Sequence, residues 1–293
     1  MLVASTGVIG RYLPMDAVKS GIADACGALS PDGGDRAAHA IMTTDTRPKL
    51  AGYELELGGA TVRVGGIAKG AGMIHPDLAT MLAFVTTDAA VEPGFLASIV
   101  KRVGDRSFNR LTIDGDTSTN DTFLLLANGA AGNSPVRPAT PEADHLEAAL
   151  QAVARELSRA IAMDGEGATR LITVRVLGAA DEAQAALAAR TVARSPLVKS
   201  AVHGGDPNWG RIVSALGYSG AELALDRLRV KVGEVEVFAR GAGVPVDLDA
   251  VRRTFEQQEI EITAELNLGS GDAEAWGCDL SEEYVQINAE YTT

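Results

Sequence analysis

The spacing of apolar and polar residues along the chain predicts helices and strands in mixed order. Apolar residues that recur every three or four positions predict helices over 14–25, 37–42, 95–103, 141–164 and 181–193. Alternation and short apolar runs predict strands over 2–4, 53–57, 61–64, 81–87, 111–113, 123–127, 171–177, 228–232, 235–238, 259–266 and 284–289. Because several strands follow one another without an intervening helix, the fold class is predicted to be α+β, with mixed sheets and packed helices.

Turn and capping residues bound several of these elements. Gly58-Gly59 and Gly233-Glu234 each separate two predicted strands by two residues, which is the spacing of a tight hairpin. Thr140-Pro141-Glu142 combines an N-cap residue, a proline and an acidic residue. A long helix is therefore predicted to begin there and to stop at Gly165.

Length, composition and charge narrow the class of protein. The chain has 293 residues, 46% of them apolar and 22% charged, which suits one large or two ordinary globular domains. Two domains are predicted, 1–167 and 168–293. The net charge of −13, without a basic block, argues against a nucleic-acid partner. No apolar run approaches the roughly 18 residues of a membrane span. Cys26 and Cys278 are too few for a disulfide framework and fit no metal motif, so a cytoplasmic protein is expected.

Generic motifs do not assign a chemistry. In the glycine-rich segment 65–72, Lys69 precedes a glycine and no Ser or Thr follows, so the segment is neither a Walker loop nor a G-x-G-x-x-G motif. Asp114, Asp116 and Asp121 cluster acidic groups, but their spacing misses the EF-hand pattern, and they are interpreted as polar turn residues. The four histidines are scattered and show no metal-ligand spacing.

Thr80 stands at the entrance of a predicted buried strand. If the Ala79-Thr80 bond were cut, the α-amine of Thr80 would have a reference pKa near 8 and could serve as general base for the hydroxyl of the same residue. One cleavage would thus create a nucleophile and its base. By spacing alone, the simpler interpretation is that Thr80 only begins a strand, as many threonines do.

Six segments together carry a family resemblance. They are STGVIGRYLPMD, TTDTRPK, GGIAKGAGMIHPDLATML, FNRLTIDGDTSTNDT, HGGDPNWGRI and AWGCDLSEEYVQINAEYTT. In this order they resemble the ornithine acetyltransferases, which are self-processing glutamate N-acetyltransferases of arginine biosynthesis. The resemblance implies the fold of an N-terminal-threonine nucleophile enzyme and covers essentially the whole chain.

The resemblance implies cleavage and catalysis at one residue. The family cuts itself between Ala and Thr of its A-T-M-L motif, which corresponds to Ala79-Thr80 and would leave chains 1–79 and 80–293. Thr80 would then accept the acetyl group of N-acetylornithine and pass it to glutamate. The oxyanion hole of the family maps to Thr6 and Gly7, a hydroxyl and a backbone N–H that can meet a developing negative charge.

The resemblance also implies substrate contacts. Besides Thr80 these map to Thr43, Lys69, Glu166, Asn288 and Thr293. Lys69 suits a substrate carboxylate, and Glu166 is a candidate for the cationic amine of ornithine. A surface lysine, a helix-end acid and a capping threonine are the alternative interpretations of Lys69, Glu166 and Thr43. No role is assigned to other residues of the matching segments: Asp116, Asn120, Asp121, Trp209 and Arg211.

The implied enzyme needs no cofactor. Family members differ in whether acetyl-CoA is a second acetyl donor, so acetyl-CoA is a candidate co-substrate. The implied assembly is a heterotetramer of two α and two β chains made from one precursor. The alternatives are a self-processing amidohydrolase or aminopeptidase of related fold, in which water takes the acyl group, and an inactive fragment.

The beginning of the chain departs from the family pattern. Family members carry on the order of 100 residues before the S-T-G-V-I-G strand, although domain-size considerations alone would accept the present length. Met1 stands where an apolar strand residue belongs. The sequence is therefore expected to be an N-terminally truncated form of a longer enzyme.

Overall fold

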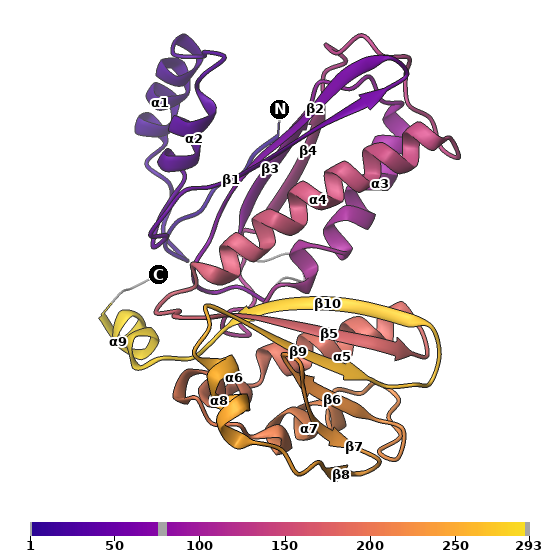
Figure 1. The fold of residues 1–293 in the computed structure, drawn as a ribbon. Coiled ribbons are helices and arrows are strands. Elements are labelled where there is room, and N and C mark those ends of the chain that lie inside the picture. The colour runs from indigo at the N-terminus through magenta and orange to yellow at the C-terminus, as the bar shows by residue number, and fades with distance from the viewer. Residues whose placement is uncertain (1, 76–80, 291–293) are drawn as a thin grey trace.

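The protein is described by a computed structural model over residues 2–75 and 81–290. Two sheets of mixed strand direction form two layers, and helices pack against both (Figure 1). The predicted α+β class with mixed sheets and packed helices is confirmed. Among the helices of the described ranges, none is both long and apolar enough to cross a membrane.

The first sheet has four strands in the order β1-β2-β3-β4. They are β1 (Lys49–Leu57), β2 (Ala60–Lys69), β3 (Leu82–Thr87) and β4 (Thr122–Ala127). The pairs β1–β2 and β2–β3 are antiparallel and β3–β4 is parallel, with Gly58-Gly59 forming the predicted hairpin turn between β1 and β2. Lys69 ends β2 and pairs in register with Leu82, so the strand end places it beside the start of β3.

One face of this sheet is covered by the long helix α4 (Pro141–Met163), with α3 (Pro93–Asp105) beside it (Figure 1). The short 3-10 helix η1 (Phe108–Arg110) contacts both of these helices. The predicted cap is confirmed, because the Thr140 side chain accepts a hydrogen bond from the Ala143 backbone. The approach of α4 requires a glycine in β2, since a Cβ on Gly66 would lie 2.9 Å from Leu157 Cδ1. The close packing at Gly66 therefore holds β2 against α4.

The second sheet has six strands in the order β10-β5-β9-β6-β7-β8. Their bounds are β5 (Leu171–Ala179), β6 (Arg229–Val232), β7 (Val235–Ala239), β8 (Ala242–Gly243), β9 (Glu259–Glu265) and β10 (Gly271–Cys278). Four helices accompany this sheet: α5 (Glu182–Arg194), α6 (Pro196–Gly204), α7 (Trp209–Gly217) and α8 (Leu248–Phe255). Each sheet has its own apolar core, and the proposed division at residue 167 stays a prediction.

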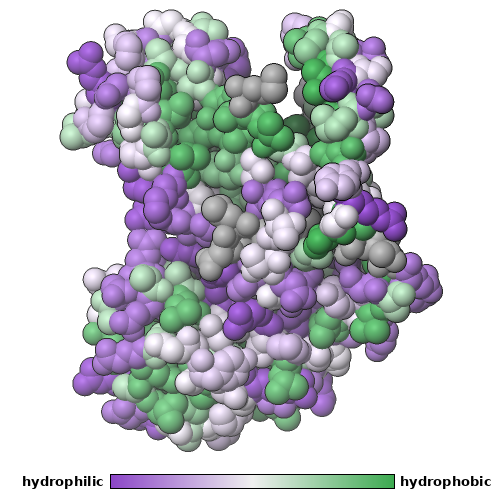
Figure 2. All heavy atoms as spheres, turned by 180° about the vertical axis from the view of Figure 1, so that it is seen from behind, coloured by the Kyte–Doolittle hydropathy of each residue, from purple (hydrophilic) through white to green (hydrophobic). Residues whose placement is uncertain are grey.

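The ends of the described chain lie beside these layers. Helices α1 (Met15–Gly27) and α2 (Gly34–Ala40) stand next to the first sheet, and α9 (Glu282–Glu290) lies at the level where the two layers meet (Figure 1). Helix α1 buries none of its residues. Seen from behind, apolar side chains lie on both sides of the notch in the upper half of the molecule (Figure 2).

Three predicted strands are wrong. Residues 2–4 form no strand with any described residue, and Val3 is 77% exposed. Residues 111–113 pair with no single neighbouring strand: Thr112 N–H donates to the Trp276 carbonyl, whereas Ile113 N–H donates to the Ile74 carbonyl. Residues 284–289 belong to α9.

The error at 284–289 has a local cause. Alternation over six residues is too short to distinguish a strand from a helix. Ser281, just before the helix, accepts a hydrogen bond from Tyr284 N–H, and Glu282 and Glu283 form an acidic first turn. These are helix-start signals, and they outweigh the alternation. The second half also holds elements that the sequence interpretation missed, among them β10 and α6 to α8.

Candidate active site

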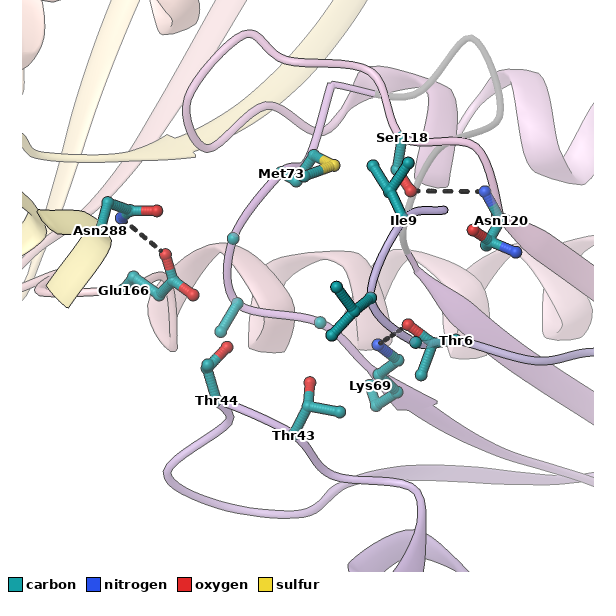
Figure 3. Close-up of a pocket in the computed structure, with 15 residues that line it drawn as sticks. Thr6, Ile9, Thr43, Thr44, Lys69, Met73, Ser118, Asn120, Glu166 and Asn288 are labelled. Carbon is teal, nitrogen blue, oxygen red and sulfur yellow. Dashed lines mark hydrogen bonds between the residues drawn. The ribbon is translucent and has the colours of Figure 1, made fainter. Parts of the chain in front are cut away.

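A cavity of about 180 Å³ lies where the N-terminal segment meets the first sheet and α9. Its wall comes from distant parts of the chain: residues 6–9, 43–44, 69–73, Ser118, Asn120, Glu166 and Asn288 (Figure 3). Six residues assigned from the family resemblance are therefore brought together, namely Thr6, Gly7, Thr43, Lys69, Glu166 and Asn288. Ala79, Thr80 and Thr293 lie outside the described residues.

Lys69 reaches this cavity from the end of β2 and is only 1% exposed. Its ammonium donates a hydrogen bond of 3.4 Å to the Thr6 hydroxyl oxygen (Figure 3). Because that oxygen accepts, the hydroxyl hydrogen remains available to donate to another group. Burial lowers the pKa of Lys69, against the opposing effect of the carboxylates of Asp45 and Asp121. A ligand carboxylate here would pair with a cation that water hardly screens.

A buried ion cluster lies behind the cavity wall. The Lys49 ammonium is 2.5 Å from Asp45 Oδ1 and 2.5 Å from Asp164 Oδ2. Asp45 also accepts hydrogen bonds from Thr43 N–H at 3.0 Å and from Gly70 N–H at 2.7 Å. One carboxylate therefore fixes the backbone on both the Thr43 side and the Lys69–Gly70 side of the cavity. Burial alone would raise the pKa of Asp45, but Lys49 and these donors hold it below its usual value.

Glu166 enters the cavity from the loop after α4 and is 8% exposed. Its backbone N–H donates to the Ala71 carbonyl at 2.8 Å, and its Oε2 accepts a hydrogen bond of 2.9 Å from Asn288 Nδ2 (Figure 3). Gly72 leaves the space for this carboxylate, because a Cβ there would lie 2.3 Å from Glu166 Oε2. The glycines that match no phosphate-loop motif thus have a steric role at this site.

Asp114 holds the loop that carries Gly72. Its carboxylate accepts hydrogen bonds from Met73 N–H at 2.6 Å and Ile74 N–H at 3.0 Å. It also accepts from Asp116 N–H within its own turn, at 3.1 Å. No group of three or more metal-ligating side chains is found within residues 2–75 and 81–290. Asp114 thus accepts hydrogen bonds from three backbone N–H groups and fixes this turn.

Asp121 was left without a role by the sequence interpretation, yet it contacts the residue that follows Thr80. Its Oδ1 accepts a hydrogen bond from Met81 N–H. Burial raises the pKa of Asp121 to about 7, although Met81 N–H and the Lys69 ammonium act in the opposite direction. The sequence signal that could have drawn attention to Asp121 is its place next to Asn120 and directly before an apolar strand.

The charges in the cavity define what it can bind. A buried lysine at one side and a buried carboxylate at another suit a small molecule that carries both an anionic and a cationic group. An amino acid with a basic side chain has both. The hydroxyl of Thr6 and the backbone at Gly7 face the same cavity and could donate to an oxyanion.

A family profile and named relatives match this chain over its full length. The ArgJ family profile matches residues 1–293. The chain is 54% identical to the arginine biosynthesis bifunctional protein ArgJ of Symbiobacterium thermophilum, covering 100% of this chain and 73% of that protein. The protein of that name from Deinococcus radiodurans is 52% identical, over 100% of this chain and 72% of that protein. The crystal structure of the Bacillus halodurans protein superposes with a TM-score of 0.71 at 40% identity, over 72% of this chain and 100% of that chain.

Proposed function

The chain belongs to the ArgJ family, and we propose that it is an acetyltransferase of arginine biosynthesis that moves the acetyl group of N-acetylornithine to glutamate. The names of its relatives support the pathway. The observation that carries the proposal is the convergence of Thr6, Gly7, Thr43, Lys69 and Glu166 on one cavity with opposite charges.

The reaction begins with activation of Thr80. Cleavage of the Ala79-Thr80 bond frees the α-amine of Thr80, which takes the proton of the Thr80 hydroxyl. The oxygen attacks the acetyl carbonyl, and the resulting oxyanion is met by the Thr6 hydroxyl and the Gly7 N–H. When the C–N bond breaks, the protonated α-amine returns its proton to the departing nitrogen of ornithine. Acetyl-Thr80 remains.

Glutamate completes the exchange by the same steps in reverse. Its neutral amine attacks acetyl-Thr80, and the hydroxyl of Thr80 is regenerated. Lys69 is suited to the substrate carboxylate, and Glu166, held by Asn288, is suited to the side-chain ammonium of ornithine. The Glu166 carboxylate thereby selects a basic amino acid as the acetyl donor.

The test combines mass measurement with transfer assays. We expect intact mass to show chains 1–79 and 80–293, and we expect Thr80→Ala to give one uncut chain without acetyl transfer. The matched control is Thr86→Ala, an exposed threonine on β3, which is expected to be cut and active. Transfer by an uncut chain, or by Thr80→Ala, would show that the nucleophile is wrongly assigned. Loss of acetyl from the donor at equal rates with and without glutamate would indicate an amidohydrolase.

Acetyl-CoA is proposed as a second acetyl donor. The word bifunctional in the names of the relatives supports a second activity. Release of CoA in the presence of glutamate, and its absence in Thr80→Ala, would establish that the same nucleophile takes acetyl from a thioester. The proposed assembly of two copies of each chain is checked by native mass of the cut protein.

A further inference from the structure

Met73 lines the cavity in a backbone conformation that its side chain disfavours (Figure 3). Its φ of 52° lies in the left-handed region, where most residues other than glycine are uncommon because the Cβ comes too close to a carbonyl oxygen. Such strain persists only where the surrounding structure holds it, and it is frequent at binding sites. The groups that hold Met73 therefore contribute to the shape of the cavity.

Asp114 holds Met73 with both oxygens of its carboxylate. Oδ2 accepts a hydrogen bond from Met73 N–H at 2.6 Å, and Oδ1 accepts from Ile74 N–H at 3.0 Å and from Asp116 N–H at 3.1 Å. The peptide groups on the two sides of the Met73 Cα thus both direct their N–H at one carboxylate, an arrangement known as an anion-binding nest. Because these two peptide planes define the backbone dihedrals of Met73, Asp114 keeps it in the left-handed conformation.

The loop that contains Met73 also supports Glu166. The Ala71 carbonyl accepts a hydrogen bond of 2.8 Å from Glu166 N–H. Gly72 lies against the carboxylate, because a Cβ there would be 2.3 Å from Glu166 Oε2. Both residues directly precede Met73, so a change of the Met73 dihedrals would shift them relative to Glu166.

Helix α9, which carries the other support of Glu166, is tied to the same carboxylate. Tyr284 lies one turn before Asn288 on this helix. Burial raises the pKa of the Tyr284 phenol, and the charges of Asp114, Asp116 and Glu166 and a hydrogen bond to Asp114 act in the same direction. The phenol therefore stays protonated and donates to the carboxylate. Asp114 thus connects the loop at Met73 with α9.

We propose that Asp114 is a positioning residue for substrate selection, which holds Met73 in the left-handed conformation and thereby keeps the Glu166 carboxylate where the side-chain ammonium of ornithine binds. This inference rests on the proposed function, in which Glu166 contacts that ammonium. Asp114 is not among the residues that line the cavity, so it acts through the loop and not on the substrate itself.

The test compares the binding of ornithine and norvaline to the full chain by calorimetry. Norvaline has the same carbon chain and the same α-groups but no side-chain ammonium. Asparagine at position 114 must turn its NH₂ toward one of the backbone N–H groups, whichever way the amide lies, so Asp114→Asn releases Met73. We expect the Kd of ornithine to rise about tenfold and that of norvaline to change less than about twofold. An equal loss for both ligands would overturn the inference, because a general loss of structure does not distinguish them.

Met73→Gly provides the second comparison, because glycine adopts the left-handed conformation without strain. In the Met73→Gly background, adding Asp114→Asn should raise the Kd of ornithine only about twofold. Equal factors in the two backgrounds would contradict the proposed action through Met73. The matched control is Asp272→Asn, an aspartate in the second sheet whose Oδ1 accepts from Gly178 N–H at 2.8 Å. Its Kd values for both ligands are expected to stay at the wild-type level.

The remaining outcomes are also decisive. Folding that is lost in Asp114→Asn and regained when Met73→Gly is added would support the inference. If neither variant folds, Tyr284→Phe replaces them, because it removes one hydrogen bond to Asp114 from an exposed helix. Its Kd for ornithine should rise about threefold with norvaline unchanged, and a wild-type Kd for ornithine would overturn the inference.

Failure of the proposed function gives a different result. If wild type binds ornithine better than norvaline but transfers no acetyl, the proposed function fails, and the binding comparison still decides the role of Asp114. If wild type binds the two ligands equally well, the inference is overturned, because the site then has no preference for the side-chain ammonium that Asp114 could support.

Discussion

The amide nitrogen Nδ2 of Asn288 lies 2.9 Å from Oε2 of Glu166, so the helix near the end of the chain contacts the loop that follows α4. This contact joins residues 122 positions apart and orients the carboxylate at the wall of the cavity. Asn288 reaches it because it lies on a helix, one turn after Tyr284, whose carbonyl accepts a second hydrogen bond from Nδ2 at 3.0 Å. The structure therefore gives the C-terminal helix a direct part in the site.

Asn288→Ala is expected to weaken this orientation without unfolding the protein. A hydrogen bond to a charged group contributes about 1.5–3 kcal/mol, and part of this is recovered from water because Asn288 is exposed, so kcat/KM for N-acetylornithine should fall about tenfold. The control is Gln286→Ala, an exposed position on the same helix. Steady-state kinetics with both variants provides the comparison, and equal kcat/KM values would contradict the assigned role of Asn288.

Gly72→Ala is expected to displace the Glu166 carboxylate, because the added Cβ would lie 2.3 Å from it. A misplacement of about 1 Å can cost about 10²-fold in rate, so kcat/KM for the donor should fall by about that factor. The control is Gly65→Ala, where no heavy atom lies within 4 Å of the added Cβ. Kinetics and melting temperature are measured for both. A Gly72→Ala enzyme with wild-type kinetics would mean that Glu166 does not contact the substrate.

Lys49→Met tests the buried ion cluster. The side chains of Lys49, Asp45 and Asp164 are 1%, 0% and 3% exposed. Removing the Lys49 ammonium therefore leaves two buried carboxylates without their shared cationic partner. Such a loss costs about 3–5 kcal/mol of unfolding free energy. Burial acts to raise the pKa of Asp45 and Lys49 acts to lower it, so without Lys49 this carboxylate takes up a proton at a higher pH and the loss should be smaller at acidic pH. Urea unfolding of wild type and variant, at neutral and at acidic pH, measures this change in unfolding free energy.

The control for the cluster is a lysine on the surface. Lys101 pairs with Asp105, and their side chains are 79% and 44% exposed. Exposed pairs contribute about 0–1 kcal/mol, so Lys101→Met should change stability little at either pH. If both lysine variants lost the same stability, the burial of the Lys49 cluster would not be what stabilises the fold.

The raised pKa of Asp121 predicts a pH dependence of stability. The folded protein holds this proton up to a pH near its pKa of about 7. The unfolded chain releases it near the reference pKa of about 3.9. The contribution of Asp121 to stability is therefore greatest below about pH 4 and is lost as the pH rises through 7. Asparagine does not titrate, so Asp121→Asn should raise the melting temperature more at pH 8 than at pH 5. Equal differences at the two pH values would contradict the raised pKa.

Local sequence determined the family, the fold class and most elements of the first half. The six matching segments identified the ornithine acetyltransferases, and membership of the ArgJ family confirms that resemblance. The Gly58-Gly59 hairpin and the Thr140 cap could be predicted because turn and cap hydrogen bonds are made between residues a few positions apart.

Only the tertiary structure decided how the site is assembled. Residues 284–289 alternate as a strand does, but helix-start contacts at Ser281 make them helical and bring Asn288 to Glu166. The bond from Met81 N–H to Asp121 spans 40 positions, and no local pattern reports it. Periodicity together with capping residues such as Ser281 indicates which element a segment forms. Contacts between distant segments depend instead on how the sheets, α4 and α9 pack and on which buried polar groups then need a partner.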